Sequence, residues 1–277
     1  MKQKAMIQKV GYAVFLVLFL FIMIAPMLYM ISASFMSEAD LNVIPPKLLP
    51  SAPSLANYAR ALVQQPILKY VYNSFVITII AVAICITAGS MASYALTRTN
   101  IRFKTTFLVF VLAISLLPTI TLINPIFKMY SKLGLLNTHI GLAVIISVLD
   151  LPMTIWFLTA VLKNVPISFE ESAKLDGANM FQIFIYILVP LLKASIFSIS
   201  ILVFIGAWNR FLLSQVLNQY EDYRTVVVGL TLYQTTHTIP FGVVAAAGLI
   251  TIFPLLAMVL LFQKNILGGI MEGGVKE

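Results

Sequence analysis

Long stretches without a charged residue are the feature that most restricts how this chain can fold. No charge occurs between Lys9 and Glu38 or between Lys69 and Arg98, and 60% of all residues are hydrophobic against 10% charged. An apolar run of about 20 residues is long enough for a helix to cross a bilayer. The sequence therefore predicts an all-α integral membrane protein, embedded in the lipid bilayer. Its six transmembrane helices are expected near residues 11–32, 74–96, 104–128, 140–162, 191–213 and 241–263.

The first apolar run has a second interpretation, as a cleaved signal peptide. Lys2, Lys4 and Lys9 precede it, and a Ser-Ala-Ser sequence follows at residues 32–34. The apolar core of a signal peptide is only about 7–15 residues long. Because this run is much longer, an uncleaved anchor is favoured.

Basic residues indicate which connections face the cytoplasm. Eleven of the 18 Lys and Arg residues fall on the side of the N-terminus, and Arg98, Arg102 and Lys104 cluster in one tight turn. Cytoplasmic connections carry an excess of Lys and Arg, so both termini are expected in the cytoplasm. We attribute the net charge of +8 to this orientation, and no nucleic-acid partner is expected.

A charged segment interrupts the apolar pattern between the fourth and fifth runs. Ser168 with a Glu three residues later is a capping-box pattern, which predicts a helix over residues 169–176. Gly177 can adopt the left-handed conformation that ends a helix. A second helix is expected from about Asn179, and Pro190 should end or kink it at the membrane boundary.

A helix of two turns is unstable alone in water, so this segment needs a surface to pack on. One alternative is that the helix lies on the lipid surface, but such helices prefer basic polar faces. Three of the four charges here are acidic, and the small residues allow close approach of another chain. A protein partner is therefore favoured, with contacts expected from Glu170, Glu171, Ser172, Ala173, Lys174, Asp176, Gly177 and Ala178.

The same segment resembles a signature of the permease subunits of ATP-binding-cassette (ABC) importers. That signature is Glu-Ala-Ala, three residues, Gly, nine residues, Ile, one residue and Leu-Pro. The chain has Glu171-Ser172-Ala173, Gly177, Ile187 and Val189-Pro190 at this spacing, with Ser172 and Val189 as mild departures. Similarity to the carbohydrate branch, in particular to maltose-type second permeases, comes from "DGA" at 176–178, "LGLLNT" at 133–138, "WN" at 208–209 and the ending "GGVKE".

This resemblance implies a type I importer permease fold in a bacterial or archaeal cytoplasmic membrane, and import of a sugar. Residues 163–190 would form the coupling loop that contacts the ATPase, ending near Ile187 and Pro190. The implied partners are a second homologous permease subunit, two cytosolic ABC ATPase subunits and an external sugar-binding protein. ATP and Mg would be bound by the ATPase, so no cofactor is expected in this chain. Residues 1–70 would form the first helix and an external loop, 71–264 the permease core and 265–277 a cytoplasmic tail.

Polar residues inside the spans are candidates for a substrate pathway. Asp150 is costly in lipid, and it shares one helix face with Ser147 and Thr154. That face could line a sugar pathway or gate, or it could make a structural contact with a partner span or with a Lys or Arg; the sequence does not separate these. Arg210 could pair with Asp150 or extend to the outer surface, and the extended position is favoured. Further pathway candidates are Asn124 and Asn209.

Other functions fit the sequence less well. No Gly-x-x-x-x-Gly-Lys-Ser/Thr sequence occurs, so the chain is not expected to hydrolyse ATP or to act as an enzyme. His139 and His237 lack partners at metal-ligand spacing, so no metal site is expected. The alternative function is a stand-alone secondary transporter or channel that is not powered by ATP. The lack of a clear internal repeat and the acidic short helix weigh against it.

Overall fold

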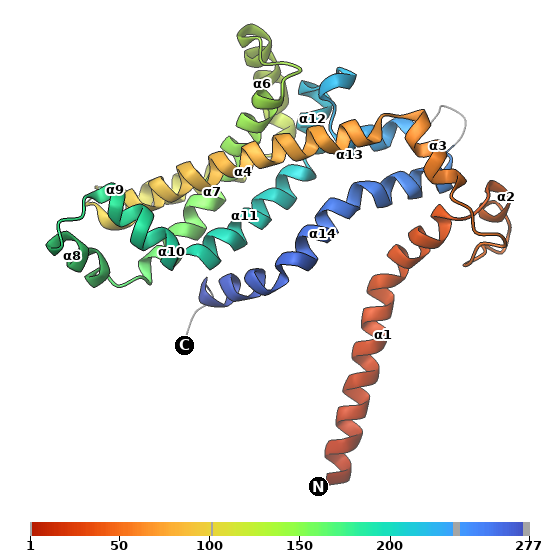
Figure 1. Cartoon of the computed structure of the whole chain (residues 1–277), viewed down its shortest axis with the longest axis horizontal. Helices are drawn as coiled ribbons and strands as arrows, with labels where there is room; N and C mark the ends of the chain where they lie inside the picture. The colour runs from red at the N-terminus through yellow and green to blue at the C-terminus, as the bar shows by residue number, and fades with distance from the viewer. Residues whose placement is uncertain (1, 101, 235–238, 274–277) are drawn as a thin grey trace. The chain divides into compact units, whose positions relative to one another are not determined.

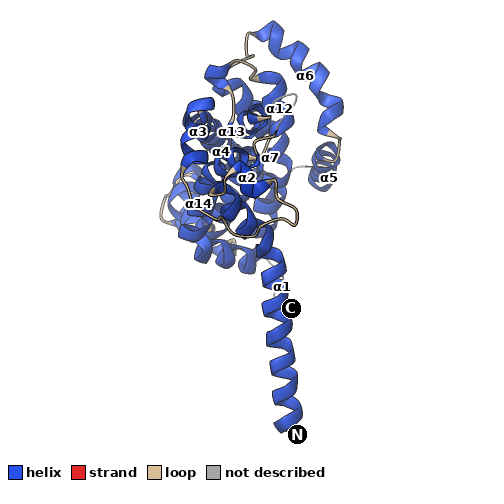
Figure 2. Cartoon of the chain, turned by 90° about the vertical axis from the view of Figure 1, so that its right-hand side faces the viewer, coloured by secondary structure: helices blue, strands red, loops and turns tan. Residues whose placement is uncertain are grey.

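The computed structural model describes residues 2–100, 102–234 and 239–273, and every regular element within them is helical (Figures 1 and 2). The chain divides into two units, Met1–Leu68 with Gly229–Phe253 and Lys69–Val228 with Pro254–Glu277. His237 and the last four residues of the chain lie outside the described residues. The helices are α1 (Lys2–Ser34), α2 (Glu38–Leu41), α3 (Ala56–Gln64), α4 (Ile67–Arg98), α5 (Lys104–Ser115), α6 (Thr119–Leu133), α7 (His139–Lys163), α8 (Ser168–Leu175), α9 (Met180–Gln182), the π-helix η1 (Ile183–Leu188), α10 (Val189–Leu191), α11 (Lys193–Trp208), α12 (Phe211–Leu217), the 3₁₀ helix η2 (Glu221–Tyr223), α13 (Val226–Gly229), the 3₁₀ helix η3 (Leu230–Tyr233) and α14 (Phe241–Gly273).

Four helices in the described part of the chain are long and apolar enough to cross a membrane. Their spanning segments are Gly11–Ser34, Ile67–Arg98, His139–Lys163 and Phe241–Gln263, and two further pairs of helices qualify if each bent pair counts as one span. In Gly11–Ser34 the most apolar stretch has no buried residue. An apolar helix with all faces exposed is suited to lipid and not to water.

The third and fifth predicted spans are not continuous helices, and in this respect the prediction was wrong. The third is broken into α5 and α6 with a bend of 90° (Figure 2). Pro118 lies at this break with an extended backbone. The helix ends before it because proline lacks the amide that would continue the helix and disfavours helical geometry in the residue before it. In the fifth, α11 ends at Trp208 and α12 begins at Phe211.

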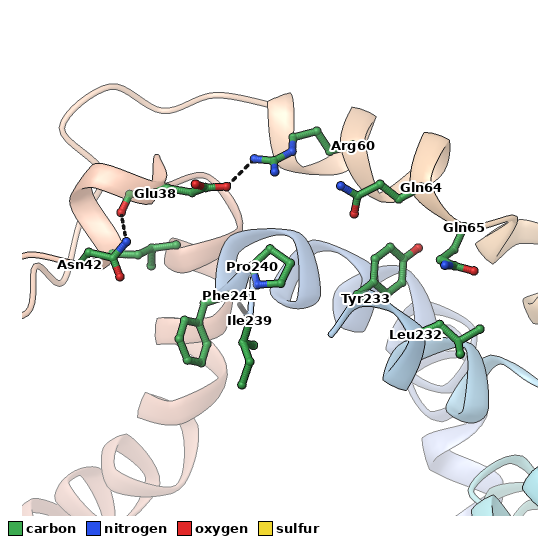
Figure 3. Close-up of a pocket in the computed structure, with 11 residues that line it drawn as sticks. Glu38, Asn42, Arg60, Gln64, Gln65, Leu232, Tyr233, Ile239, Pro240 and Phe241 are labelled. Carbon is green, nitrogen blue, oxygen red and sulfur yellow. Dashed lines mark hydrogen bonds and ion pairs between the residues drawn. The ribbon is translucent and has the colours of Figure 1, made fainter. Parts of the chain in front are cut away.

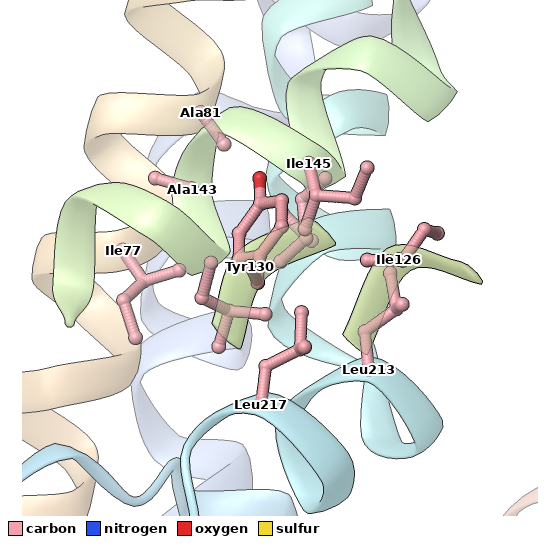
Figure 4. Packing of buried hydrophobic residues seen from close by; sticks show 11 residues of the cluster. Ile77, Ala81, Ile126, Tyr130, Ala143, Ile145, Leu213 and Leu217 are labelled. Atoms are coloured by element: carbon pink, nitrogen blue, oxygen red, sulfur yellow. The ribbon is translucent and has the colours of Figure 1, made fainter. Parts of the chain in front are cut away.

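The second unit has a core made by helices that are distant in sequence. Buried apolar side chains of α4, α6, α7 and α12 meet in one cluster (Figure 4). α4 and α7 approach each other closely, since a Cβ atom at Gly89 would come within 2.7 Å of Thr154 Cγ2. The cluster includes Ile77, Ala81, Ile126, Tyr130, Leu142, Ile145, Ile146, Leu213 and Leu217.

The first unit is held together by polar contacts to backbone groups. Asn57 on α3 donates through Nδ2 to the carbonyls of Ser34 at 3.0 Å and Met36 at 2.8 Å, which fastens α3 to the end of α1. In the loop after α2, the Lys47 ammonium lies 2.6 Å from Asp40, and Ser51 donates to the same carboxylate through its amide and its hydroxyl. These donors lower the pKa of the Asp40 carboxyl from its ordinary value of 3.8 to about 2.

Candidate functional site

The short charged helix predicted between the fourth and fifth spans is α8, and it lies at one end of the second unit beside α9 (Figure 1). Its predicted capping box is wrong. The backbone is already helical at Ile167, which is the N-cap, and the Ile167 carbonyl accepts the amides of Glu170 and Glu171. Ser168 therefore lies inside the first turn, where its hydroxyl cannot serve as the cap.

The predicted end of α8 at Gly177 is confirmed, since this residue has a φ of +84°. The Gly177 amide donates to the Lys174 carbonyl at 3.1 Å, and the Ala178 amide donates to the Ala173 carbonyl at 2.9 Å. This pair of bonds is a Schellman motif, in which a residue at positive φ reverses the chain after a helix. The turn leaves Asp176 and Gly177 exposed.

The predicted second helix begins where expected. Asn179 is the N-cap of α9, and its side chain forms a reciprocal capping box with Gln182. The helix continues as η1, which includes Ile187, and then as α10, which includes Pro190. Its axis then bends by 79° into α11, so the change of direction follows two residues after the proline.

The two faces of α8 differ in what they contact. Ala173 is buried against an apolar cluster that includes Leu162, Ile183 and Leu188. On the opposite face Leu175 is 90% exposed. Leu175 was not among the predicted contacts. Within the predicted contact set Ala178 is half-buried, and the exposed residues are Glu171, Ser172, Lys174, Asp176 and Gly177.

Glu170 was expected among the contacts to a partner, but its side chain points into this chain. It is 2% exposed and accepts a charge-assisted hydrogen bond at 2.5 Å from Nε of Arg98, the last residue of α4. Arg98 also donates through Nη2 to the Val165 carbonyl at 2.8 Å, and the Tyr94 hydroxyl donates to Glu170 Oε2 at 3.2 Å. Sequence reasoning missed Arg98 and Tyr94 as site residues; the only signal was the basic cluster that ends the second span.

Arg210 pairs with Asp150 and does not extend to the outer surface, so the favoured interpretation of this residue was wrong. The pair joins α7 to the break between α11 and α12. Asp150 Oδ2 and Arg210 Nε are buried, and the structure gives them no hydrogen-bond partner. Removing either charge would therefore leave the other in a poorly solvated site.

The remaining pathway candidates fall into two groups. Ser147 and Thr154 are fully buried, and their hydroxyls donate to the carbonyls of Ala143 at 2.7 Å and Asp150 at 3.0 Å. Asn124 and Asn209 are exposed on α6 and at the end of α11. Only the two asparagines therefore present polar groups to a surface in this conformation.

The first unit contains a hollow of about 680 Å³, lined by both polar and apolar side chains, that the sequence did not indicate (Figure 3). Glu38 on α2 and Arg60 on α3 form an ion pair of 2.7 Å at its edge. Gln64, Gln65, Tyr233 and Phe241 complete much of its lining. Among the described residues no group of three His, Cys, Asp or Glu side chains could hold a metal ion.

Similarity to known proteins is extensive. Residues 85–267 match the family described as binding-protein-dependent transport system inner membrane components. A sulfoquinovosyl glycerol transport system permease of Agrobacterium fabrum is 33% identical over 251 residues, which cover 91% of this chain and 88% of that protein. A trehalose/maltose transport system permease of Thermococcus litoralis is 34% identical over 264 residues, which cover 94% of each chain.

A solved structure agrees with these sequence relationships. A chain of a bacterial ABC transporter that imports the acidic polysaccharide alginate matches with a TM-score of 0.78 and 25% identity, over 93% of this chain and 96% of that one. The helical fold with several apolar spans is thus that of an ABC importer permease. The protein belongs to the binding-protein-dependent transport system inner membrane components: it is a multi-pass permease subunit of an ABC importer and not an enzyme.

Proposed function

We propose that this permease imports a sugar or a short oligosaccharide and that residues 163–190 couple its movements to ATP hydrolysis by a cytosolic partner. The observation that carries the coupling role is the two-sided character of α8, with an anchored inner face and an outer face that carries exposed Glu171, Lys174 and Leu175. A two-turn helix needs such anchoring to keep its shape when a partner pushes on it. The sugar class rests on relatives whose names refer to sulfoquinovosyl glycerol and to trehalose and maltose.

The proposed topology has six spans with both termini in the cytoplasm. It counts the bent pair of α5 and α6 as one span and takes α11 together with α12 as another. In the fifth, the 16 residues of α11 measure about 24 Å, which is shorter than the hydrocarbon core of about 30 Å, so α12 would complete the crossing. Arg98 contacts Glu170, so the basic turn at residues 98–104 and α8 share one side of the membrane. The excess of Lys and Arg makes that side the cytoplasm.

The proposed assembly contains a second homologous permease, two cytosolic ABC ATPase subunits and an external sugar-binding protein. ATP and Mg would be bound by the ATPase subunits. The bacterial or archaeal cytoplasmic membrane is the corresponding location. Within the chain, Asn124, Asn209 and the Asp150–Arg210 pair are proposed to face or gate the sugar pathway, whereas Ser147 and Thr154 would support it through helix packing.

Co-purification tests the coupling role. The tagged chain is expressed with its ATPase and the second permease, and the complex is isolated in detergent. Glu171→Lys should lose the ATPase while it retains the second permease, because it reverses an exposed charge on α8 without touching the core. Lys132→Glu, a charge reversal near the end of α6, serves as the matched control and should retain both. Equal recovery of the ATPase with the Glu171→Lys variant would contradict the proposed coupling surface.

The substrate class is tested separately. The complex with its binding protein is placed in lipid nanodiscs, and ATP hydrolysis is measured with maltose, trehalose, a sulfonated sugar glycoside and an amino acid mixture. Stimulation by one of the saccharides alone supports a sugar importer. Stimulation by the amino acids and by none of the saccharides would contradict it.

A further inference from the structure

The contact between α4 and α8 combines two polar bonds to one buried carboxylate. Glu170 is 2% exposed and the Arg98 side chain is 10% exposed, with Nε and Oε1 2.5 Å apart. Tyr94 donates to the second carboxylate oxygen at 3.2 Å. Both carboxylate oxygens of Glu170 therefore accept hydrogen bonds from α4. The two donors, Tyr94 and Arg98, lie one helical turn apart on that helix.

Arg98 also holds the chain that enters α8. Its Nη2 donates at 2.8 Å to the carbonyl of Val165, in the loop between α7 and α8. The planar guanidinium can make both bonds at once because its donors have a fixed fork geometry. One side chain thus fixes the loop and the helix that follows it.

An apolar contact completes this attachment. The Tyr94 ring meets Phe184 of η1 edge to face with centroids 5.8 Å apart, and Ala173 packs in the same buried cluster. The covalent connections of α8 are short loops, at 164–167 and 176–179, and they lead to α7 and α9. The Arg98–Glu170 contact adds a third connection, to a helix that is 72 residues away in sequence.

We propose that Arg98, supported by Tyr94, is a positioning residue that makes α4 and α8 move as one body, so that a displacement of α8 by the ATPase reaches α4 directly. This inference rests on the proposed coupling function of α8. A buried ion pair suits this task because separating its charges would leave each of them buried and uncompensated. Without the pair, α8 could move with its ATPase while α4 stayed behind.

Paired spin labels on α8 and α4 test this inference in the assembled importer in nanodiscs. Leu175→Cys and Ala88→Cys are exposed positions for the labels, and Cys85→Ala removes the only native cysteine. Distances are measured without nucleotide and with ATP and vanadate. The parent protein should give one narrow distance population in both states. Arg98→Gln should give a second, longer population with ATP and vanadate.

Three further variants separate a positioning role from general destabilisation. Arg98→Glu combined with Glu170→Arg should restore the single population, because the ion pair is rebuilt in reverse. Arg98→Lys should give an intermediate result, since it keeps the charge but its single nitrogen lacks the planar fork that places separate donors at Glu170 and Val165. Arg102→Gln, an exposed neighbour in the same turn, should match the parent.

The bound ATPase is quantified in each sample. If Arg98→Gln retains the ATPase and keeps one narrow population, the positioning role is wrong while the coupling surface stands. If even the parent fails to bind the ATPase, the proposed coupling function is wrong, and this inference fails with it. If the variant that combines Arg98→Glu with Glu170→Arg keeps the same second distance population as Arg98→Gln, this would also contradict the positioning role.

Discussion

Replacing Gly177 with alanine should weaken binding of the ATPase through backbone strain alone. Gly177 has a φ of +84°, and a Cβ atom built at this position meets no atom within 4 Å. Steric overlap with neighbours is therefore absent, and the cost is that of a left-handed conformation in an L-residue, about 1–2 kcal/mol. If the turn must keep its geometry for docking, this corresponds to a loss of about 5–30-fold in affinity.

Two comparison variants make this prediction specific. Gly177→Asn should lose much less affinity, because asparagine adopts positive φ more readily than alanine. Gly134→Ala provides a matched strain elsewhere, since Gly134 ends α6 with a φ of +67° and also has open space around it. This control should be destabilised to a similar degree without any change in ATPase affinity.

The assay is binding of the purified ATPase to the permease pair in nanodiscs, measured by biolayer interferometry, with thermal unfolding of each variant as a reference. The expected order of affinity is parent, Gly177→Asn, then Gly177→Ala, with Gly134→Ala equal to the parent. Unchanged affinity for Gly177→Ala would refute the strain argument. Equal losses for Gly177→Ala and Gly134→Ala would show that stability, and not the turn at α8, determines binding.

Three further predictions concern packing, charge and pH. Gly89→Ala should lower the unfolding temperature in detergent, at a cost of about 1–3 kcal/mol from overpacking, and Thr154→Ser should recover much of it by removing the opposing methyl group. Arg210→Ala should cost about 3 kcal/mol because it strands the Asp150 carboxylate, and Arg210→Gln with Asp150→Asn should cost less. The Asp40 carboxylate has a pKa lowered to about 2, so its stabilisation of the loop is complete above pH 3.8 and disappears toward pH 2. Hydrogen exchange of the backbone amide that donates to Asp40 should accelerate over that interval relative to the intrinsic rate.

Each of these predictions has a result that would contradict it. If Thr154→Ser does not improve the Gly89→Ala variant, the close contact is not the cause of the destabilisation. If the double neutral variant is as unstable as Arg210→Ala, the uncompensated charge is not what matters. If protection of the loop amide is constant from pH 4 to pH 2, the carboxylate of Asp40 does not stabilise the loop.

The features that could be predicted from the sequence depend either on neighbouring residues in the chain or on whether a segment suits lipid or water. Apolar run length located the four long apolar helices, because hydrocarbon excludes charge over about 20 residues. The turn at Gly177 was predictable because few residues tolerate positive φ. The break at Pro118 was not predicted, although proline is a local signal, because an apolar run on both sides suggested one continuous span.

The long-range contacts could not be derived from the pattern. Glu170 and Arg98 are 72 residues apart and Asp150 and Arg210 are 60 apart. Which charges meet depends on which helices pack together and on which of their residues face each other. The sequence pattern alone does not give this pairing. The prediction therefore assigned Glu170 to a contact with a partner protein and Arg210 to the outer surface. In both cases it placed the charge outside the packed interior of this chain.

The most direct test of the account is site-specific labelling at Leu175, which is 90% exposed on α8. The single native cysteine, Cys85, is buried, so Leu175→Cys is expected to be the only reactive thiol. In right-side-out vesicles it should be protected from a membrane-impermeant maleimide, and a photoactivatable reagent attached to it should cross-link to the ATPase. Labelling from outside, or the absence of an ATPase adduct in the assembled complex, would contradict a cytoplasmic coupling helix.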